Sequence, residues 1–168
     1  MAHGCSLYLV RHAIAAERGE EYPDDSKRPL TSDGAAKFRK AARGLAELGV
    51  EVEAILTSPF TRARQTAELL AAELSGHPQV IEVASLEPGM RFEQLVDALK
   101  EHRGCATLAL VGHEPGIGAA AARLIGSETA LEFKKGAVCR IDVEACPPSE
   151  PGALRWFMTQ KILKGLKT

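Results

Sequence analysis

The sequence predicts an α/β protein: a three-layer α/β/α sandwich with a mostly parallel central sheet and an antiparallel edge near the C-terminus. Short apolar runs rich in strand formers alternate with amphipathic segments between residues 7 and 125. Strands that alternate with helices form parallel sheets, because each helix returns the chain along one face of the sheet. Two more strand-like runs then follow each other across a proline-rich stretch, which favours antiparallel pairing at one edge.

Length and composition favour one domain over residues 1–168, long enough to bury a core without metal or disulfides. Because 21 Lys and Arg balance 22 Asp and Glu, we expect neither nucleic acid nor a membrane surface as a partner. No apolar stretch is long enough to span a bilayer, and the cysteines form no metal-ligand or disulfide pattern. We therefore expect a cytoplasmic monomer that uses no metal or cofactor.

The first elements are a buried strand, a loop and a helix. Residues 7–10 form a continuous apolar run, typical of a strand covered on both faces. Residues 17–28 are rich in charge and contain Gly and Pro, so they predict a surface loop. Thr31 is the predicted N-cap of an amphipathic helix, and Gly49 is its predicted stop.

The same alternation continues through the middle of the chain. Residues 52–57 predict a second strand, which Ser-Pro ends because proline cannot extend the hydrogen-bonded ladder. A helix follows over residues 61–74, with apolar or small residues on one face. Residues 80–83 predict a short third strand, and the next helix begins at residue 92 and stops near Gly104.

The last third of the chain predicts a strand over residues 107–111 and an alanine-rich helix that reaches about Ile125. Residues 137–143 and 154–158 predict the two antiparallel strands. We expect the C-terminal lysines to lie in a solvated tail: Lys161, Lys164 and Lys167.

The candidate site lies at the carboxyl ends of three predicted strands. Parallel strands end at the same edge of a sheet, where ligands usually bind, so four side chains should converge there. These are Arg11, His12, Arg62 and His113. Arginine forks match phosphate oxygens two at a time, and a neutral imidazole is a nucleophile. Clustered cations should help to keep His12 neutral. The set predicts an anion site with a nucleophile.

Four phrases resemble the histidine phosphatase superfamily, also called the phosphoglycerate mutase-like superfamily. Residues 9–13 resemble its Arg-His-Gly signature, with Ala in the place of Gly. Residues 57–67 resemble its second motif, and residues 111–116 resemble its second-histidine motif. Residues 28–31 with Gly34 are similar to the SixA-like phosphohistidine phosphatase branch. Their order and spacing make the combination specific, and the resemblance runs from residue 7 to about residue 125.

The resemblance implies a metal-independent phosphatase. His12 would accept the phosphoryl group, and water would then hydrolyse the phosphohistidine intermediate. Arg11, Arg62 and His113 would hold the phosphate oxygens, as in-line phosphoryl transfer requires.

The class of substrate depends on whether the site contains a general acid, a residue that protonates the leaving oxygen. The nearest candidate is Glu87, but the match to the short branch puts Pro88 where other branches keep a carboxylate. Without an acid, alkyl phosphates would be poor substrates, whereas the weaker bond of phosphohistidine would suffer less. A phosphohistidine-containing protein is thus the favoured substrate. Arg28 could line the pocket mouth or be an ordinary loop residue, and Glu114 fits an orienting or capping role better than an acid.

Two other functions fit the same residues. One is a small-molecule phosphomonoesterase or pyrophosphatase of the same superfamily, acting on a phosphorylated metabolite. The other is a phospho-ligand binding module without turnover. The intact set of two arginines and two histidines argues against the binding module, because a binder does not need a nucleophile.

Overall fold

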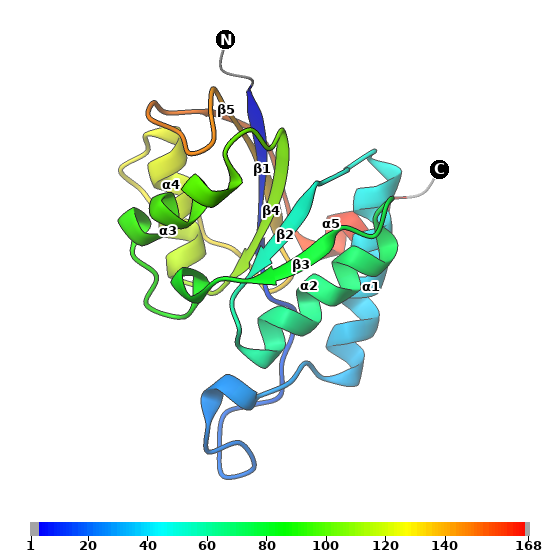
Figure 1. Ribbon diagram of the computed structural model, residues 1–168. Coiled ribbons are helices and arrows are strands. Elements are labelled where there is room, and N and C mark those ends of the chain that lie inside the picture. The colour runs from blue at the N-terminus through cyan, green and yellow to red at the C-terminus, as the bar shows by residue number, and fades with distance from the viewer. Residues whose placement is uncertain (1–3, 167–168) are drawn as a thin grey trace.

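The computed structural model describes residues 4–166 and contains a six-stranded sheet in the order β3-β2-β4-β1-β5-β6 (Figure 1). Strands β3, β2, β4 and β1 are parallel, β5 runs antiparallel to β1, and β6 runs antiparallel to β5. The strands are β1 (Cys5–Arg11), β2 (Ala54–Thr57), β3 (Gln79–Glu82), β4 (Thr107–Gly112), β5 (Val138–Val143) and β6 (Ala153–Met158). The predicted mostly parallel sheet with an antiparallel C-terminal edge is confirmed.

Helices cover both faces of the sheet and make the three predicted layers (Figure 1). They are α1 (Ser32–Glu47), α2 (Thr61–Glu73), α3 (Phe92–Leu99), α4 (Gly116–Ile125) and α5 (Gln160–Lys164). Helices α1, α2 and α5 pack on one face, and α3 and α4 pack on the other. Within residues 4–166, no helix combines the length and apolarity needed to cross a membrane.

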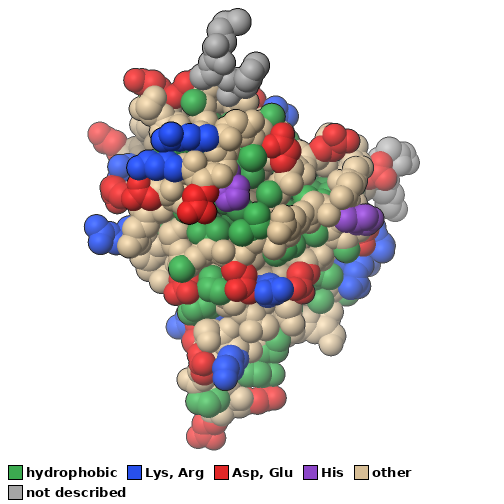
Figure 2. All heavy atoms as spheres, viewed as in Figure 1, with side chains coloured by type: hydrophobic (Ala, Val, Ile, Leu, Met, Phe, Trp, Pro, Cys, Tyr) green, Lys and Arg blue, Asp and Glu red, His purple; other side chains and the backbone are tan. Residues whose placement is uncertain are grey.

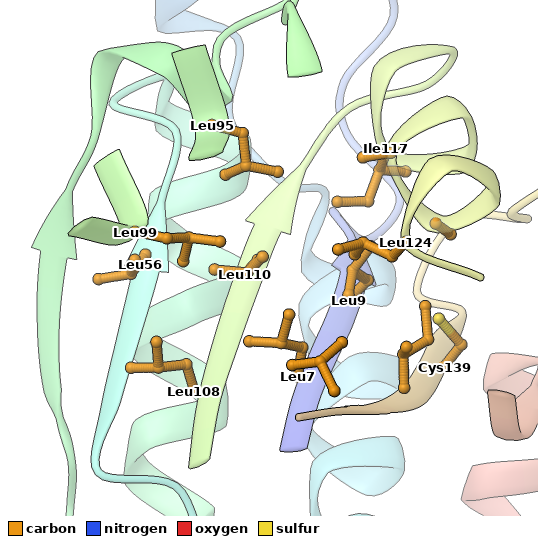
Figure 3. Close-up of a cluster of buried hydrophobic side chains, with 14 of the residues drawn as sticks. Leu7, Leu9, Leu56, Leu95, Leu99, Leu108, Leu110, Ile117, Leu124 and Cys139 are labelled. Carbon is orange, nitrogen blue, oxygen red and sulfur yellow. The ribbon is translucent and has the colours of Figure 1, made fainter. Parts of the chain in front are cut away.

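Side-chain alternation along β1 divides the core between the two faces. Leu7 and Leu9 pack toward α3 and α4, among the leucines drawn in Figure 3, whereas Tyr8 and Val10 pack toward α1 and α2. Successive strand residues point to opposite faces, so a strand buried on both sides is apolar throughout. This explains the uninterrupted apolar run that marked β1 in the sequence.

The start and end of α1 follow the predicted capping residues. The Thr31 side chain accepts a hydrogen bond of 2.8 Å from the Gly34 N–H, and Gly49 adopts φ 76° after the last turn. Gly34 also allows a close approach, because an added Cβ would lie 2.1 Å from the Ile14 carbonyl oxygen. The first turn of α1 is thereby packed directly on the segment that follows β1.

The predicted solvated tail is in part helical: residues 160–164 form α5, in which Lys161 is exposed and Lys164 is half-buried. Thr159 caps this helix by accepting a hydrogen bond from the Ile162 N–H, and Leu163 is fully buried. Leu163 lies against Gly44 of α1, where an added Cβ would be 2.0 Å from the Leu163 carbonyl oxygen. Burial of this one leucine stabilises the helix, although lysines lie on either side of it in the sequence. Lys167 lies outside the described residues.

The segment predicted as a helix up to about Gly104 is helical as far as His102, in two parts. Its α-helical part ends at Leu99, and a 3-10 turn over Lys100–His102 completes it. The tighter turn is a common way for a helix to end.

Residues 16–30 form a blue loop in Figure 1 that projects below the sheet, and Figure 2 shows it as a lobe that carries acidic side chains. The segment is a loop, as predicted, except for a 3-10 turn over Asp25–Lys27. An isolated bridge between Ala15 and Leu30 closes its base. The loop thus leaves the sheet at the end of β1 and returns beside α1.

Candidate active site

The carboxyl ends of β1, β2 and β4 meet at one edge of the sheet. Arg11 of β1 pairs with Gly112 of β4, and Thr57 of β2 pairs with Val111 of β4. A cavity of about 320 Å³ opens at this edge. All four residues predicted to converge line it: Arg11, His12, Arg62 and His113.

His12 follows β1 directly and is 5 % exposed. Its Nδ1 lies 2.7 Å from the Ala13 carbonyl oxygen, which can only accept, so we assign the ring proton to Nδ1 and the lone pair to Nε2. Burial lowers the pKa of His12 to about 3, and the charges of Arg62 and Arg11 add to this shift. The sequence suggested the cations as the cause, but burial has the larger effect. The ring is neutral at pH 7.

His113 follows β4, and its ring centroid lies 5.1 Å from that of His12. Its Nε2 is 2.8 Å from Ser58 Oγ, which accepts a hydrogen bond from the Phe60 N–H. Because Ser58 Oγ already accepts this bond, we assign its own proton to the bond with Nε2 and the His113 ring proton to Nδ1. That buried Nδ1 has no hydrogen-bond partner among the described residues. Burial, with the nearby His12 and Arg62, lowers the pKa of His113 to about 3.

The two arginines are anchored on one side and unpaired on the other. Arg11 Nη1 donates to the Phe133 carbonyl oxygen at 2.7 Å, and Arg62 Nη1 and Nη2 donate to the Asp25 carbonyl and carboxylate at 2.8 and 3.0 Å. The Nε of each is buried and unpaired within residues 4–166. Burial lowers the pKa of both guanidiniums, but they remain charged at pH 7. Buried donors without partners are a natural place for an anion.

The first two turns of α2 hold this arrangement together. Thr66 Oγ1 accepts the Ala13 N–H at 3.0 Å and donates to the Arg62 carbonyl at 2.7 Å. Gln65 Oε1 accepts the Leu30 N–H at 2.8 Å. Sequence reasoning gave no role to these side chains, although both lie in the second motif. The available signal was a polar pair three and four residues after a candidate phosphate-binding arginine, one helical turn along.

The residues on which the sequence left alternatives open are also placed. Arg28 lines the cavity and is 8 % exposed, so it is no ordinary loop arginine. Glu87 is half-buried and lies outside the cavity lining, whereas Pro88 belongs to that lining. Glu114 lines the cavity, but its Oε1 accepts the Gly118 N–H at 2.7 Å in the first turn of α4, which confirms the capping role.

Comparison with protein-family models matches residues 7–87 to the histidine phosphatase superfamily (branch 1). An uncharacterized protein of Picosynechococcus sp. is 42 % identical over 137 residues, which cover 79 % of this chain and 81 % of the relative. The phosphohistidine phosphatase SixA of Escherichia coli K12 is 31 % identical over 164 residues, which cover 96 % of this chain and 98 % of that protein.

Comparison with solved structures finds the protein histidine phosphatase SixA complexed with tungstate, at a TM-score of 0.83 and 29 % identity. The match covers 94 % of this chain and 99 % of that one. The similarity in sequence and in structure therefore covers nearly the whole chain.

Proposed function

The chain belongs to the histidine phosphatase superfamily (branch 1), and on that premise we propose that it is a metal-independent phosphatase that removes phosphate from phosphohistidine in a protein. The observation that carries the proposal is the neutral His12 ring beside three unpaired donors. Those donors are Arg11 Nε, Arg62 Nε and His113 Nδ1.

In the first step, His12 Nε2 attacks the phosphorus in line with the bond to the leaving imidazole. The P–N bond of the substrate breaks as the P–N bond to His12 forms, and the leaving imidazole takes a proton from solvent. Arg11, Arg62, His113 and Arg28 hold the equatorial oxygens, where charge is greatest in the transition state. In the second step, a water oxygen attacks phosphorus, the P–Nε2 bond breaks, and the water proton leaves with solvent.

The carboxylates that line the cavity favour a phosphoramidate substrate, in which phosphorus is bonded to nitrogen. Of the two carboxylates that line the cavity, Glu114 is held by the Gly118 N–H and Glu17 is exposed at the mouth. Pro88 occupies the lining next to Glu87. An alkoxide leaves badly without a positioned acid, whereas an imidazole leaves more easily. The similarity to phosphohistidine phosphatase SixA supports a protein as the carrier.

The proposal extends to the setting of the reaction. The four cysteines are free thiols, which suits a reducing compartment, so we propose that the protein acts in the cytoplasm. We also propose that it acts as a monomer, because the catalytic set comes from one chain.

Intact-mass analysis tests the reaction. Wild type, His12→Ala and the control His102→Ala, which lies outside the cavity, are mixed briefly with a histidine-phosphorylated protein and quenched at alkaline pH. Wild type and His102→Ala should dephosphorylate the partner and show a transient phosphate adduct. His12→Ala should show neither.

A partner left untouched by wild type would contradict the protein substrate, and small phosphoesters and diphosphates would be tested next. Turnover by His12→Ala at the wild-type rate would contradict His12 as the nucleophile.

A further inference from the structure

Asp25, in the projecting loop, links two arginines that line the cavity. Its Oδ2 accepts from Arg62 Nη2 at 3.0 Å, and its carbonyl oxygen accepts from Arg62 Nη1 at 2.8 Å. Its Oδ1 accepts from Arg28 Nε at 3.1 Å and lies 3.5 Å from Nε of the exposed Arg18. One acidic residue therefore contacts three cations, two of which are almost fully buried.

The contacts fix how each guanidinium is oriented. Both Nη atoms of Arg62 are turned toward Asp25, which leaves the buried Arg62 Nε without a partner among the described residues. Arg28 is held through Nε by Asp25 and through Nη1 by the Ala16 carbonyl at 2.7 Å. Its Nη2 makes no hydrogen bond to any of the residues that the structure describes.

Electrostatics gives the bridge a second effect. Burial is the main reason that the pKa of Arg62 is lowered, and the nearby Arg28 charge lowers it further. Two guanidiniums in one buried site repel each other, and a carboxylate between them offsets that repulsion. Burial alone would raise the pKa of Asp25, but the hydrogen bonds and charges of Arg28 and Arg62 hold it below its ordinary value. Asp25 is therefore ionised at pH 7.

We propose that Asp25 is a positioning residue for the phosphate site, which holds Arg62 and Arg28 side by side with their free donors directed at the phosphoryl oxygens. This inference rests on the proposed function, because it takes Arg62 and Arg28 as phosphate-binding. It also assigns a task to the projecting loop: the 3-10 turn over Asp25–Lys27 carries the anchor of the anion site.

Tungstate, a tetrahedral oxyanion, serves as the probe, because its binding requires no turnover. Calorimetric titration at pH 7 compares wild type with Asp25→Asn and Asp25→Glu. Asp24→Asn is the matched control: Asp24 is the exposed neighbour, and its side chain bonds only Ser26 within residues 4–166. Asp25→Asn should bind tungstate at least about tenfold more weakly, because a charge-assisted contact to each arginine is lost.

Asp25→Glu keeps the charge and should restore affinity to within about threefold of wild type, and Asp24→Asn should bind as wild type does. Asp25→Asn that binds as tightly as wild type, or more tightly, overturns the proposal; tighter binding would make the carboxylate a competitor of the anion. Asp25→Glu that binds as weakly as Asp25→Asn also overturns it, since the defect would then not follow the charge.

Arg62→Ala separates this inference from the proposed function. If Arg62→Ala binds tungstate as wild type does, the phosphate site itself is wrong. If Arg62→Ala binds tungstate more weakly than wild type but Asp25→Asn does not, the phosphate site is supported and the role of Asp25 is refuted.

Discussion

His12 and His113 lie within one cavity, and each is neutral because its ring is buried beside cations. The hydrogen-bond partners then assign opposite tasks to the two rings. The Ala13 carbonyl holds the proton of His12 on Nδ1 and leaves Nε2 as a base, whereas Ser58 leaves the proton of His113 on Nδ1 as a donor. Under the proposed function, the two rings would thereby supply a nucleophile and an oxyanion contact.

The buried histidines predict acid sensitivity. The unfolded chain binds protons as pH falls below about 6.5, whereas the folded rings resist protonation until about pH 3. The unfolded state therefore gains protons first, and stability is lost as pH falls through this window. Between pH 7 and pH 5, each ring should cost on the order of 2 kcal/mol.

Urea unfolding in phosphate-free buffer at pH 7 and pH 5 measures this loss. His113→Gln should remove about half of the difference between the two pH values, and His102→Gln should leave it as in wild type. If His113→Gln lost as much unfolding free energy as wild type between pH 7 and pH 5, His113 would not be a source of the acid sensitivity.

Ser58→Ala tests the tautomer of His113. Without the hydroxyl, Nε2 loses its 2.8 Å partner and the ring can place its proton on either nitrogen. We expect kcat to fall about tenfold with a smaller change in KM, because an oxyanion contact matters most in the transition state. Steady-state kinetics on the phosphorylated protein measure the effect. Ser127→Ala, at a half-buried loop position outside the cavity, is the control, and an unchanged kcat in Ser58→Ala would refute the role.

At the scale of elements, the N-cap of α1 is a test of local stability. Thr31→Ala removes the side chain that accepts the Gly34 N–H and should lower the free energy of unfolding by about 1 kcal/mol. Ser32→Ala, one residue along and exposed, should change it by less than about 0.5 kcal/mol. Equal losses in the two variants, measured by urea unfolding, would show that the cap contributes little.

Strands and long helices could be predicted because their signals are local. The apolar run of β1, the cap at Thr31 and the stop at Gly49 each depend on residues near in sequence. The five-residue helix α5 could not be predicted, because its stability comes from burial of Leu163 against Gly44. A contact between residues so far apart in the chain leaves no periodic pattern.

The candidate site could likewise be predicted only in part from the sequence. The convergence of the four residues followed from topology, because parallel strands end at one edge. The bridge from Asp25 to Arg62 and the hydroxyl of Ser58 against His113 were not predictable, since both depend on how a loop and a ring are oriented in three dimensions. The sequence specifies which residues meet more readily than how they are turned.

For the molecule as a whole, one continuous sheet predicts that residues 4–166 unfold as a single unit. Trp156, the only tryptophan of the chain, lies on the edge strand β6 with its ring centroid 6.0 Å from that of Tyr8 on β1. Its fluorescence and the far-ultraviolet circular dichroism should therefore give the same urea midpoint. An earlier fluorescence transition would show that the β5–β6 edge unfolds separately.

The central position of β1 has a consequence for synthesis of the protein. Residues 5–11 leave the ribosome well before their neighbours in the sheet, which are β4 at Thr107–Gly112 and β5 at Val138–Val143. A growing chain has no partner for its first strand until most of the protein has been translated. His12 is thus synthesised long before the strands that hold β1 in the sheet, and a chain that terminates before β4 carries His12 without His113.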